Sequence, residues 1–156
     1  MLNICYMFFL LCNFTDWSYK LFEKNTNSII NVIDENLPHN NNNKFNIYYE
    51  KRIKSQKRII SKIQKLKIPY DVYGLRIIYN DNANYYNTNF AYFIKNIIYN
   101  NFNTLDCIYD DYIQKPKQNN YQSLHVYVIT SMLIEIQIRN SNMHNISVNG
   151  SASHYY

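Results

Sequence analysis

Helical spacing of apolar residues dominates the first 67 residues of the chain. Residues 14–35 carry apolar side chains at three- and four-residue steps, which predicts one or two helices. Pro38 and the asparagines at 40–43 interrupt this spacing and predict a polar loop. Residues 52–67 then predict a helix with one apolar and one basic face. The apolar face holds Ile59, Ile60, Ile63 and Leu66, and the basic face holds Lys54, Arg58, Lys62 and Lys65.

The remainder of the chain alternates between strand and helix spacing. Residues 70–79 are rich in β-branched and aromatic residues, which predicts a strand, and residues 85–99 return to helical spacing. After a polar loop, residues 123–130 and 132–138 alternate as the two strands of a hairpin would. A final helix is predicted over residues 141–153. This order of elements predicts an α+β domain with a small mixed sheet flanked by helices.

Composition narrows the class of protein that these elements can form. The 156 residues suit one domain, and a hydrophobic content of 47% argues against wholesale disorder. The 17 tyrosines, 2 glycines and abundant Asn, Ile and Lys indicate an A/T-rich coding sequence, so an isolated Tyr or Asn is weak evidence of a site. The 3 cysteines lack ligand-like spacing, which favours reduced thiols over disulfides or a zinc site.

The first 12 residues are apolar apart from Asn3 and are too short to span a bilayer. They lack a basic start and a small-residue cleavage site, so a core-packing helix is favoured over a cleaved leader there. We therefore expect no membrane partner and an intracellular protein, in the cytoplasm or a plastid. Oligomerisation is left open.

Basic residues concentrate in residues 51–67, which hold 8 of the 16 Lys and Arg and no acid. The rest of the chain has 8 bases against 11 acids, a net charge of −3. A local basic block on a mildly acidic body predicts a polyanion site, with triphosphates and nucleic acid as candidates. A solvated helix face is an equally ordinary reading of the block. Four cations on one helix face repel each other, and a bound anion would relieve that repulsion.

A second chemical signal lies in the last predicted strand. There Glu135, Gln137 and Arg139 alternate with isoleucines, so they share the face opposite the apolar one. An exposed edge face accounts for many such strands. Asp71, on the strand predicted before it, adds a second carboxylate. Two carboxylates from neighbouring strands can hold one Mg²⁺, which prefers such ligands together with phosphate oxygens.

Several short motifs follow one another in a fixed order. Residues 110–125 read DDYIQKPKQNNYQSLH and residues 135–139 read EIQIR. Upstream lie RIKS at 52–55, Lys62, and YDVYGLR at 70–76; downstream lie Met143-His144, Gly150, Ala152 and His154. Over about residues 50–156 this set resembles the synthetase domain of the RelA/SpoT (p)ppGpp synthetases, whose loop reads D-Y-I-x-x-P-K-x-N-G-Y-Q-S-L-H and whose strand reads E-x-Q-I-R.

This resemblance implies a nucleotidyltransferase-like synthetase domain at residues 50–156, short at its C-terminus, after an N-terminal helical segment with an Asn-rich loop at 1–49. No metal-binding His-Asp pattern of the family's hydrolase domain occurs before residue 50. The chain is thus expected to be a small synthetase or a synthetase fragment.

The implied reaction transfers the β,γ-pyrophosphate of ATP to the 3′-hydroxyl of GDP or GTP, with Mg²⁺ as cofactor. Asp71 and Glu135 are then the metal-binding and catalytic residues, and Glu135 is the base for the hydroxyl. The implied ATP-binding residues are Arg52, Lys54, Ser55, Lys62 and Arg76. The implied acceptor-binding residues are Lys117, Asn119, Tyr121, Gln122, His125, Gln137, Arg139 and Asp111, with Tyr121 stacking on guanine.

The chain departs from the family pattern at four positions. Asn120 stands where the loop usually has Gly, and Asn tolerates the positive φ that such a turn needs. Ile108 lacks the charge thought to bias the acceptor toward GTP or GDP, which leaves acceptor preference open. Arg58 replaces a usual Ser and adds a cation near the ATP phosphates. Val148 replaces a usual Glu in the last helix.

Two other functions stay in view beside an active synthetase. The departures at Ile108, Asn120 and Val148 suit a guanine-nucleotide or alarmone-binding module without turnover. The basic block alone would suit RNA, but the aromatic residues interleaved with it look like core rather than a stacking platform. We therefore rank RNA binding lowest and expect no nucleic-acid partner.

Overall fold

The computed structural model describes residues 16–38, 46–80 and 88–150. The sequence predictions for residues 1–12, for the asparagines at 40–43, for the start of the helix at 85 and for residues beyond Gly150 lie outside these ranges. Among the described residues, no helix combines the length and the apolar character that a membrane span needs.

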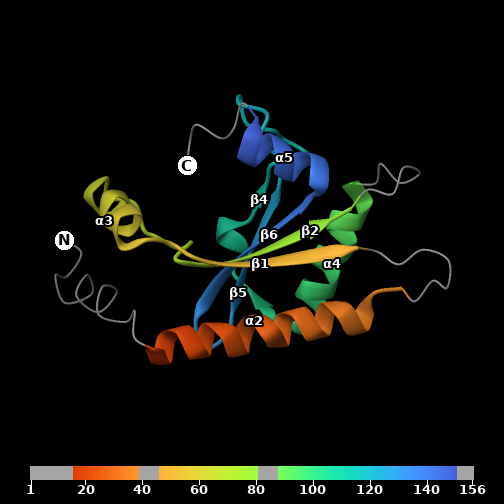
Figure 1. The fold of residues 1–156 in the computed structure, drawn as a ribbon, viewed down its shortest axis with the longest axis horizontal. Coiled ribbons are helices and arrows are strands. Elements are labelled where there is room, and N and C mark those ends of the chain that lie inside the picture. The colour runs from red at the N-terminus through yellow and green to blue at the C-terminus, as the bar shows by residue number, and fades with distance from the viewer. Residues whose placement is uncertain (1–15, 39–45, 81–87, 151–156) are drawn as a thin grey trace.

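A mixed sheet organises the molecule (Figure 1). Its strands run in the order β1-β2-β6-β5-β3, and β4 pairs with β5. Only β2 and β6 are parallel to each other among the described pairs. The strands are β1 Ile47–Ile53, β2 Tyr73–Tyr79, β3 Asn103–Thr104, β4 Asp110–Asp111, β5 Leu124–Ile129 and β6 Leu133–Asn140. The helices are α2 Asp16–Asn36, α3 Gln56–Gln64, α4 Thr88–Asn101 and α5 Ser141–Asn149, with a 3₁₀ turn η1 Asp106–Ile108. The predicted α+β class, with a mixed sheet flanked by helices, is confirmed.

One face of the sheet forms the core. Ile134, Ile136 and Ile138 of β6 are fully buried on this face, as their alternation predicted. Helices α2 and α4 supply the opposing apolar residues, including Phe22, Ile29, Ile33, Ala91, Ile94 and Ile98. Each fully buried isoleucine stabilises the fold by roughly 1.5–3 kcal/mol relative to exposure. The opposite sheet face is left for the polar residues of β5 and β6.

The sequence prediction of a single helix over residues 52–67 is wrong at both ends. Residues 47–53 form β1, which pairs with β2 along its whole length, from Ile47 opposite Tyr79 to Ile53 opposite Tyr73. Arg52 is thus a strand residue, and Lys54 lies between β1 and α3. Strand pairing overrode the helical spacing of the cations, since β1 places Ile47, Tyr49 and Ile53 against the core.

Helix α3 ends in a left-handed residue. The backbone N–H of Leu66 donates to the carbonyl of Ile63 at 2.9 Å, and that of Lys67 donates to the carbonyl of Lys62 at 3.0 Å. Leu66 has φ of 56°, a conformation that favours glycine, and its side chain is 86% exposed. The turn therefore holds a strained leucine that the core does not use.

Strand β1 also crosses the predicted domain boundary after residue 49, and α2 shares one core with the sheet. The division into 1–49 and 50–156 stays a prediction. Within β1, Lys51 faces α2, where its ammonium contacts Glu23 and donates to Asn27 Oδ1 at 2.7 Å. This lysine of the basic block therefore stabilises helix packing rather than facing the polar side of the sheet.

Candidate functional site

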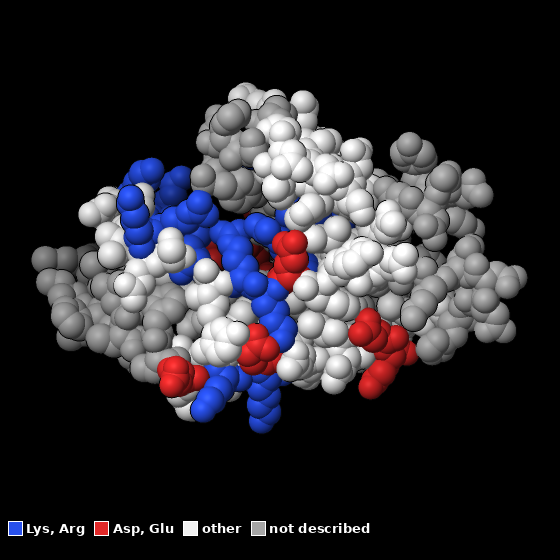
Figure 2. All heavy atoms as spheres, viewed as in Figure 1, with Lys and Arg blue, Asp and Glu red and all other residues white. Residues whose placement is uncertain are grey.

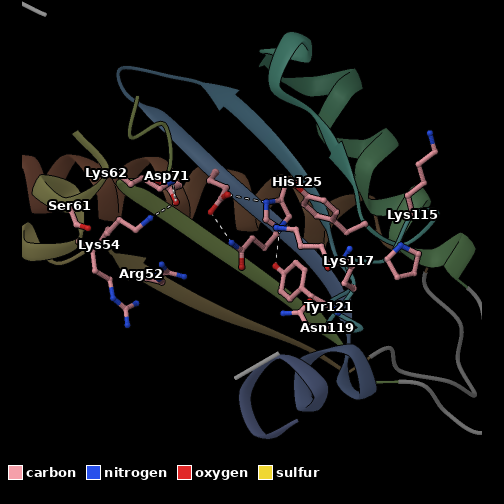
Figure 3. Close-up of a pocket in the computed structure, with 16 residues that line it drawn as sticks. Arg52, Lys54, Ser61, Lys62, Asp71, Lys115, Lys117, Asn119, Tyr121 and His125 are labelled. Carbon is pink, nitrogen blue, oxygen red and sulfur yellow. Dashed lines mark hydrogen bonds and ion pairs between the residues drawn. The ribbon is translucent and has the colours of Figure 1, made fainter. Parts of the chain in front are cut away.

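A cleft of about 950 Å³ opens on the polar side of the sheet, a size ordinary for small-molecule sites. Lys and Arg side chains gather around its entrance near α3 (Figure 2). Figure 3 shows Arg52, Lys54 and Lys62 on one side, Lys117, Asn119 and Tyr121 on the other, and His125 between them. The lining residues are Arg52, Lys54, Arg58, Ser61, Lys62, Asp71, Tyr112, Lys115, Pro116, Lys117, Gln118, Asn119, Tyr121, His125, Glu135 and Gln137.

The first wall of the cleft centres on Asp71, which lies in the turn just before β2. Its carboxylate accepts hydrogen bonds from Lys62 at 2.8 and 2.9 Å and from the ammonium of Lys54. Burial alone would raise the pKa of Asp71, but the hydrogen bonds from Lys54 and Lys62 outweigh it and hold that pKa below its usual range. Burial lowers the pKa of Lys54 despite the neighbouring carboxylate. Lys54, Lys62 and Asp71 together therefore carry a net positive charge on the first wall of the cleft.

The floor of the cleft centres on Glu135 in β6. Its Oε1 accepts a hydrogen bond from the Tyr127 hydroxyl at 3.0 Å and lies 3.1 Å from His125 Nδ1. Its Oε2 accepts from Gln137 Nε2 at 2.8 Å. Burial would raise the pKa of Glu135, but the hydrogen bond and charge of His125 outweigh it, so the net direction is downward. A buried carboxylate is therefore held ionised in the middle of the cleft.

The second wall is the loop between β4 and β5. Its tight turn has the Asn120 N–H donating to the Lys117 carbonyl at 2.8 Å, and Asn120 has φ of 62°. The prediction that Asn120 adopts the positive φ of the usual glycine is confirmed. Lys117 Nζ lies 4.1 Å from the ring centre of Tyr112 and 5.3 Å from that of Tyr121. Tyr121 is 5% exposed, since its ring also contacts Tyr112 and His125, and its stacking on guanine stays a prediction.

Ten of the predicted site residues line this one cleft, although they come from separate parts of the chain. From the first wall they are Arg52, Lys54, Lys62 and Asp71; from the second wall and floor they are Lys117, Asn119, Tyr121, His125, Glu135 and Gln137. Their nucleotide-binding and catalytic roles stay predictions. What the fold adds is that all of them face a common space.

Five predicted site residues do not line the cleft. Ser55 is the exposed N-cap residue of α3, and Gln122 is half-buried before β5. Arg76 pairs with Glu50 at 3.1 Å and donates to Gln137 at 3.3 Å.

The other two of the five support the surrounding fold. Arg139 is fully buried and donates to His144 Nδ1 at 3.0 Å. Asp111 accepts from the Tyr92 hydroxyl at 2.9 Å and from the backbone N–H of Gln114 at 2.8 Å, which fixes the start of the loop. Arg139 thus contacts α5 and Asp111 fixes the loop of the second wall, and the roles of both toward a nucleotide stay predictions.

Sequence reasoning did not assign five residues that line the cleft: Ser61, Tyr112, Lys115, Pro116 and Gln118. Ser61 lies three residues after Arg58 in α3, so helical periodicity places both on one face. The other four lie inside the loop motif itself. Tyr112 could not be recognised as a site residue, because tyrosine is abundant throughout the chain.

The two cleft carboxylates have the chemistry of a partial Mg²⁺ site. Among the described residues no group of three or more His, Cys, Asp or Glu could hold a metal ion. Mg²⁺ in nucleotide sites needs only one or two carboxylates, because phosphate oxygens and waters complete its shell. Gly74 lies beside Glu135, since a Cβ built there would lie 4.0 Å from Glu135 Oε2, in ordinary contact. Two carboxylates that line one cleft have the ligand chemistry for a metal that arrives with a polyphosphate, and the metal-binding roles of Asp71 and Glu135 stay predictions.

Comparisons with known proteins identify the family of the chain. A family described as "Region found in RelA / SpoT proteins" matches residues 51–156. A probable guanosine-3′,5′-bis(diphosphate) 3′-pyrophosphohydrolase of Synechocystis is 34% identical over 113 residues, which are 71% of this chain and 13% of that protein. A GTP pyrophosphokinase of Haemophilus influenzae is 35% identical over 88 residues, 55% of this chain and 11% of that protein. The chain thus spans a small fraction of the length of these curated relatives.

The fold has counterparts among solved structures. The crystal structure of small alarmone synthetase 1 from Bacillus subtilis, bound to its product pppGpp, superposes with a TM-score of 0.61 at 22% sequence identity. The match covers 88% of this chain and 74% of that chain. At this identity the likeness shows a shared fold.

Proposed function

The chain belongs to the RelA/SpoT family, and from that membership we propose that it transfers the β,γ-pyrophosphate of ATP to the 3′-hydroxyl of GDP or GTP. The proposed product is the alarmone ppGpp or pppGpp, and AMP is released. One observation supports this assignment most strongly: two cationic walls face each other across a single buried carboxylate, Glu135. The Bacillus subtilis relative bound to pppGpp is consistent with it.

The charge of the cleft suits two polyphosphates. Six cations line it, four on the first wall and two, Lys115 and Lys117, on the second, against the carboxylates of Asp71 and Glu135. A concave surface with this excess of positive charge concentrates polyanionic ligands. ATP on the first wall and a guanine nucleotide on the second would each meet cations, with Glu135 between them.

Each group then has a distinct task. Lys54 and Lys62 bind the ATP phosphates and stabilise the charge that builds on the transferred group. Glu135 accepts the proton of the 3′-hydroxyl as the oxygen attacks the β-phosphorus. A bond forms between the 3′-oxygen and the β-phosphorus, and the bond from that phosphorus to the α,β-bridging oxygen breaks, so AMP leaves. Mg²⁺, when bound, would be held by Asp71 together with phosphate oxygens and would neutralise their charge, which leaves Glu135 to act as the base.

Substrate binding requires two exchanges of partner. Lys54 and Lys62 both contact Asp71 in the structure, so a phosphate group must attract these ammonium groups before Asp71 can serve a metal. We therefore expect Mg²⁺ to bind with ATP rather than before it. Lys117 must likewise leave Tyr121 before guanine stacks there.

The test is a turnover assay with the full chain, ATP, Mg²⁺ and either GDP or GTP, followed by chromatographic separation of nucleotides. We expect a 3′-pyrophosphorylated guanosine product and a matching amount of AMP. The Glu135→Gln variant serves as the paired control and should bind both nucleotides without turnover. If folded wild-type protein yields no product with either acceptor, the proposed activity is wrong.

A guanine-nucleotide-binding module without turnover is the second candidate. The observation in its favour is Lys117, which covers the buried ring of Tyr121 and would hold the acceptor site in a resting arrangement. It predicts saturable binding of GDP or pppGpp by calorimetry, while the turnover assay stays blank.

A further inference from the structure

Tyr127 of β5 contacts the central carboxylate from behind the cleft. The register of β5 and β6 places it directly opposite Glu135, and its hydroxyl donates to Glu135 Oε1 at 3.0 Å. Its side chain is buried, with 8% exposed, and it is not among the residues that line the cleft. Tyr127 therefore reaches Glu135 without a surface on which substrate could bind.

The hydrogen bonds divide the two oxygens of Glu135 unequally. Oε1 meets both Tyr127 and Nδ1 of His125, the latter at 3.1 Å, and each carboxylate oxygen has about two lone-pair positions. Oε2 accepts one hydrogen bond among the described residues, from Gln137 at 2.8 Å. Oε1 is thus saturated by protein donors, and Oε2 keeps a position for an incoming proton.

Oε2 also lies on the side of the sheet where the first wall begins. A Cβ built on Gly74, which β2 places opposite Glu135, would lie 4.0 Å from Oε2. The hydroxyl of Tyr127 and the ring of His125 approach from β5, on the other side. Oε2, which accepts only the Gln137 hydrogen bond among the described residues, is therefore the Glu135 oxygen on the β2 side.

The protonation states of the groups are consistent with this arrangement. Burial first, then the charge of Glu135, raise the pKa of the Tyr127 hydroxyl, so it stays a donor at neutral pH. On the other side of His125, the Tyr121 hydroxyl lies 2.8 Å from Nε2. His125 thus contacts Glu135 through one ring nitrogen and Tyr121 through the other.

Resting on the function proposed above, we propose that Tyr127 is a positioning residue of the pyrophosphate transfer: it orients Glu135 and saturates Oε1, so that Oε2 is the oxygen that takes the proton of the 3′-hydroxyl. Its ring does not touch substrate. Its loss should therefore lower the rate of the chemical step and leave substrate affinity unchanged.

Tyr127→Phe tests this, because it removes only the hydroxyl. Loss of a hydrogen bond to a charged group should lower kcat about tenfold. KM for ATP and for the acceptor should stay within about twofold of wild type. In the nucleotide-free protein, the Glu135 carboxyl is followed by ¹³C NMR during an acid titration. Its pKa should move up toward the ordinary value of glutamate, and the acid limb of the kcat profile should move in the same direction.

Tyr49→Phe is the matched control. Its hydroxyl also donates to a carboxylate, Asp34 Oδ1 at 2.6 Å, but in contact with α2 on the far face of the sheet. It should leave kcat and the titration of Glu135 at wild-type values. Urea denaturation confirms that both variants are folded before either readout is taken.

The two readouts separate this inference from the proposed function. An unchanged Glu135 titration in Tyr127→Phe, or a raised KM with unchanged kcat, would overturn the role of Tyr127. A wild-type chain without turnover would refute the pyrophosphate transfer and with it a role in that step, while the NMR titration would still decide whether Tyr127 holds Glu135 ionised.

Discussion

Replacing Asp71 by Asn should destabilise the protein through the lysine that it neutralises. The Lys54 side chain is 8% exposed and that of Asp71 is 15% exposed, so their ion pair is largely shielded from water. Breaking a buried pair from one side costs about 3–5 kcal/mol, because a buried charge is left without its partner. Lys62 is 36% exposed, and its contact with Asp71 adds at most about 1 kcal/mol.

We expect Asp71→Asn to lower the free energy of unfolding by about 3 kcal/mol, near the bottom of that range because solvent reaches part of Asp71. For a domain of this size this corresponds to a fall in Tm of roughly 10 °C. Lys54→Met should cost about 1 kcal/mol or less, since Asp71 keeps Lys62. The double variant removes both buried charges, so it should be more stable than Asp71→Asn by about 2 kcal/mol.

Urea denaturation followed by circular dichroism measures all four proteins, and Glu35→Gln, at an exposed position of α2, serves as a control with an effect below about 0.5 kcal/mol. The reasoning fails if Asp71→Asn loses less than about 1 kcal/mol, or if the double variant is less stable than Asp71→Asn. Either result would mean that Lys54 is solvated and does not depend on Asp71.

Three further outcomes follow from single features. Leu66→Gly should raise the free energy of unfolding by about 0.5–1 kcal/mol in urea, because glycine adopts φ of 56° without strain; an unchanged midpoint would argue against that strain. Asp111→Ala should lower the free energy of unfolding by about 2 kcal/mol in the same assay, because two backbone N–H groups and two tyrosine hydroxyls lose their acceptor. A loss below about 0.5 kcal/mol would contradict this. Folding lowers the pKa values of Asp71 and Glu135, so both carboxylates stabilise the protein above the ordinary carboxyl pKa of about 4. This stabilisation is lost as the pH falls through their lowered pKa values. The free energy of unfolding, measured in an acid titration, should therefore fall less in Asp71→Asn than in wild type.

The strand that holds Glu135 was predictable because its alternation is complete. Three isoleucines occupy one face of the strand and three polar residues the other, so the two-residue repeat of a β-strand places Glu135 on the face opposite the core. The family resemblance then assembled the loop and both carboxylates into one site, and the family membership is confirmed. Asn120 was also predictable, because few residues other than glycine adopt its φ.

Strand β1 was not predictable because a lysine interrupts its apolar face. Ile47, Tyr49 and Ile53 pack toward the core, but the residue between them is Lys51, which contacts Glu23 of α2. Only the helix that crosses this face makes that lysine acceptable there. The cations at four-residue steps then favoured a helix that starts too early.

The contacts made by Tyr127 and Lys117 were likewise beyond the sequence. With 17 tyrosines in the chain, nothing marks Tyr127 until the pairing of β5 with β6 places it against Glu135. Lys117 belongs to the motif, but its position over Tyr112 and Tyr121 depends on the turn that the loop adopts. Such contacts depend on tertiary structure, whereas spacing reports only on local structure.

The central claim is that Glu135 directs a pyrophosphate from ATP to a guanosine 3′-hydroxyl. Its most direct test uses ³¹P NMR of a reaction that contains the full chain, ATP, Mg²⁺ and GDP. We predict equal amounts of AMP and of a guanosine bearing a new 3′-pyrophosphate, with neither formed by Glu135→Gln. Release of ADP and phosphate without any 3′-linked product, or full activity of Glu135→Gln, would contradict this account of the cleft.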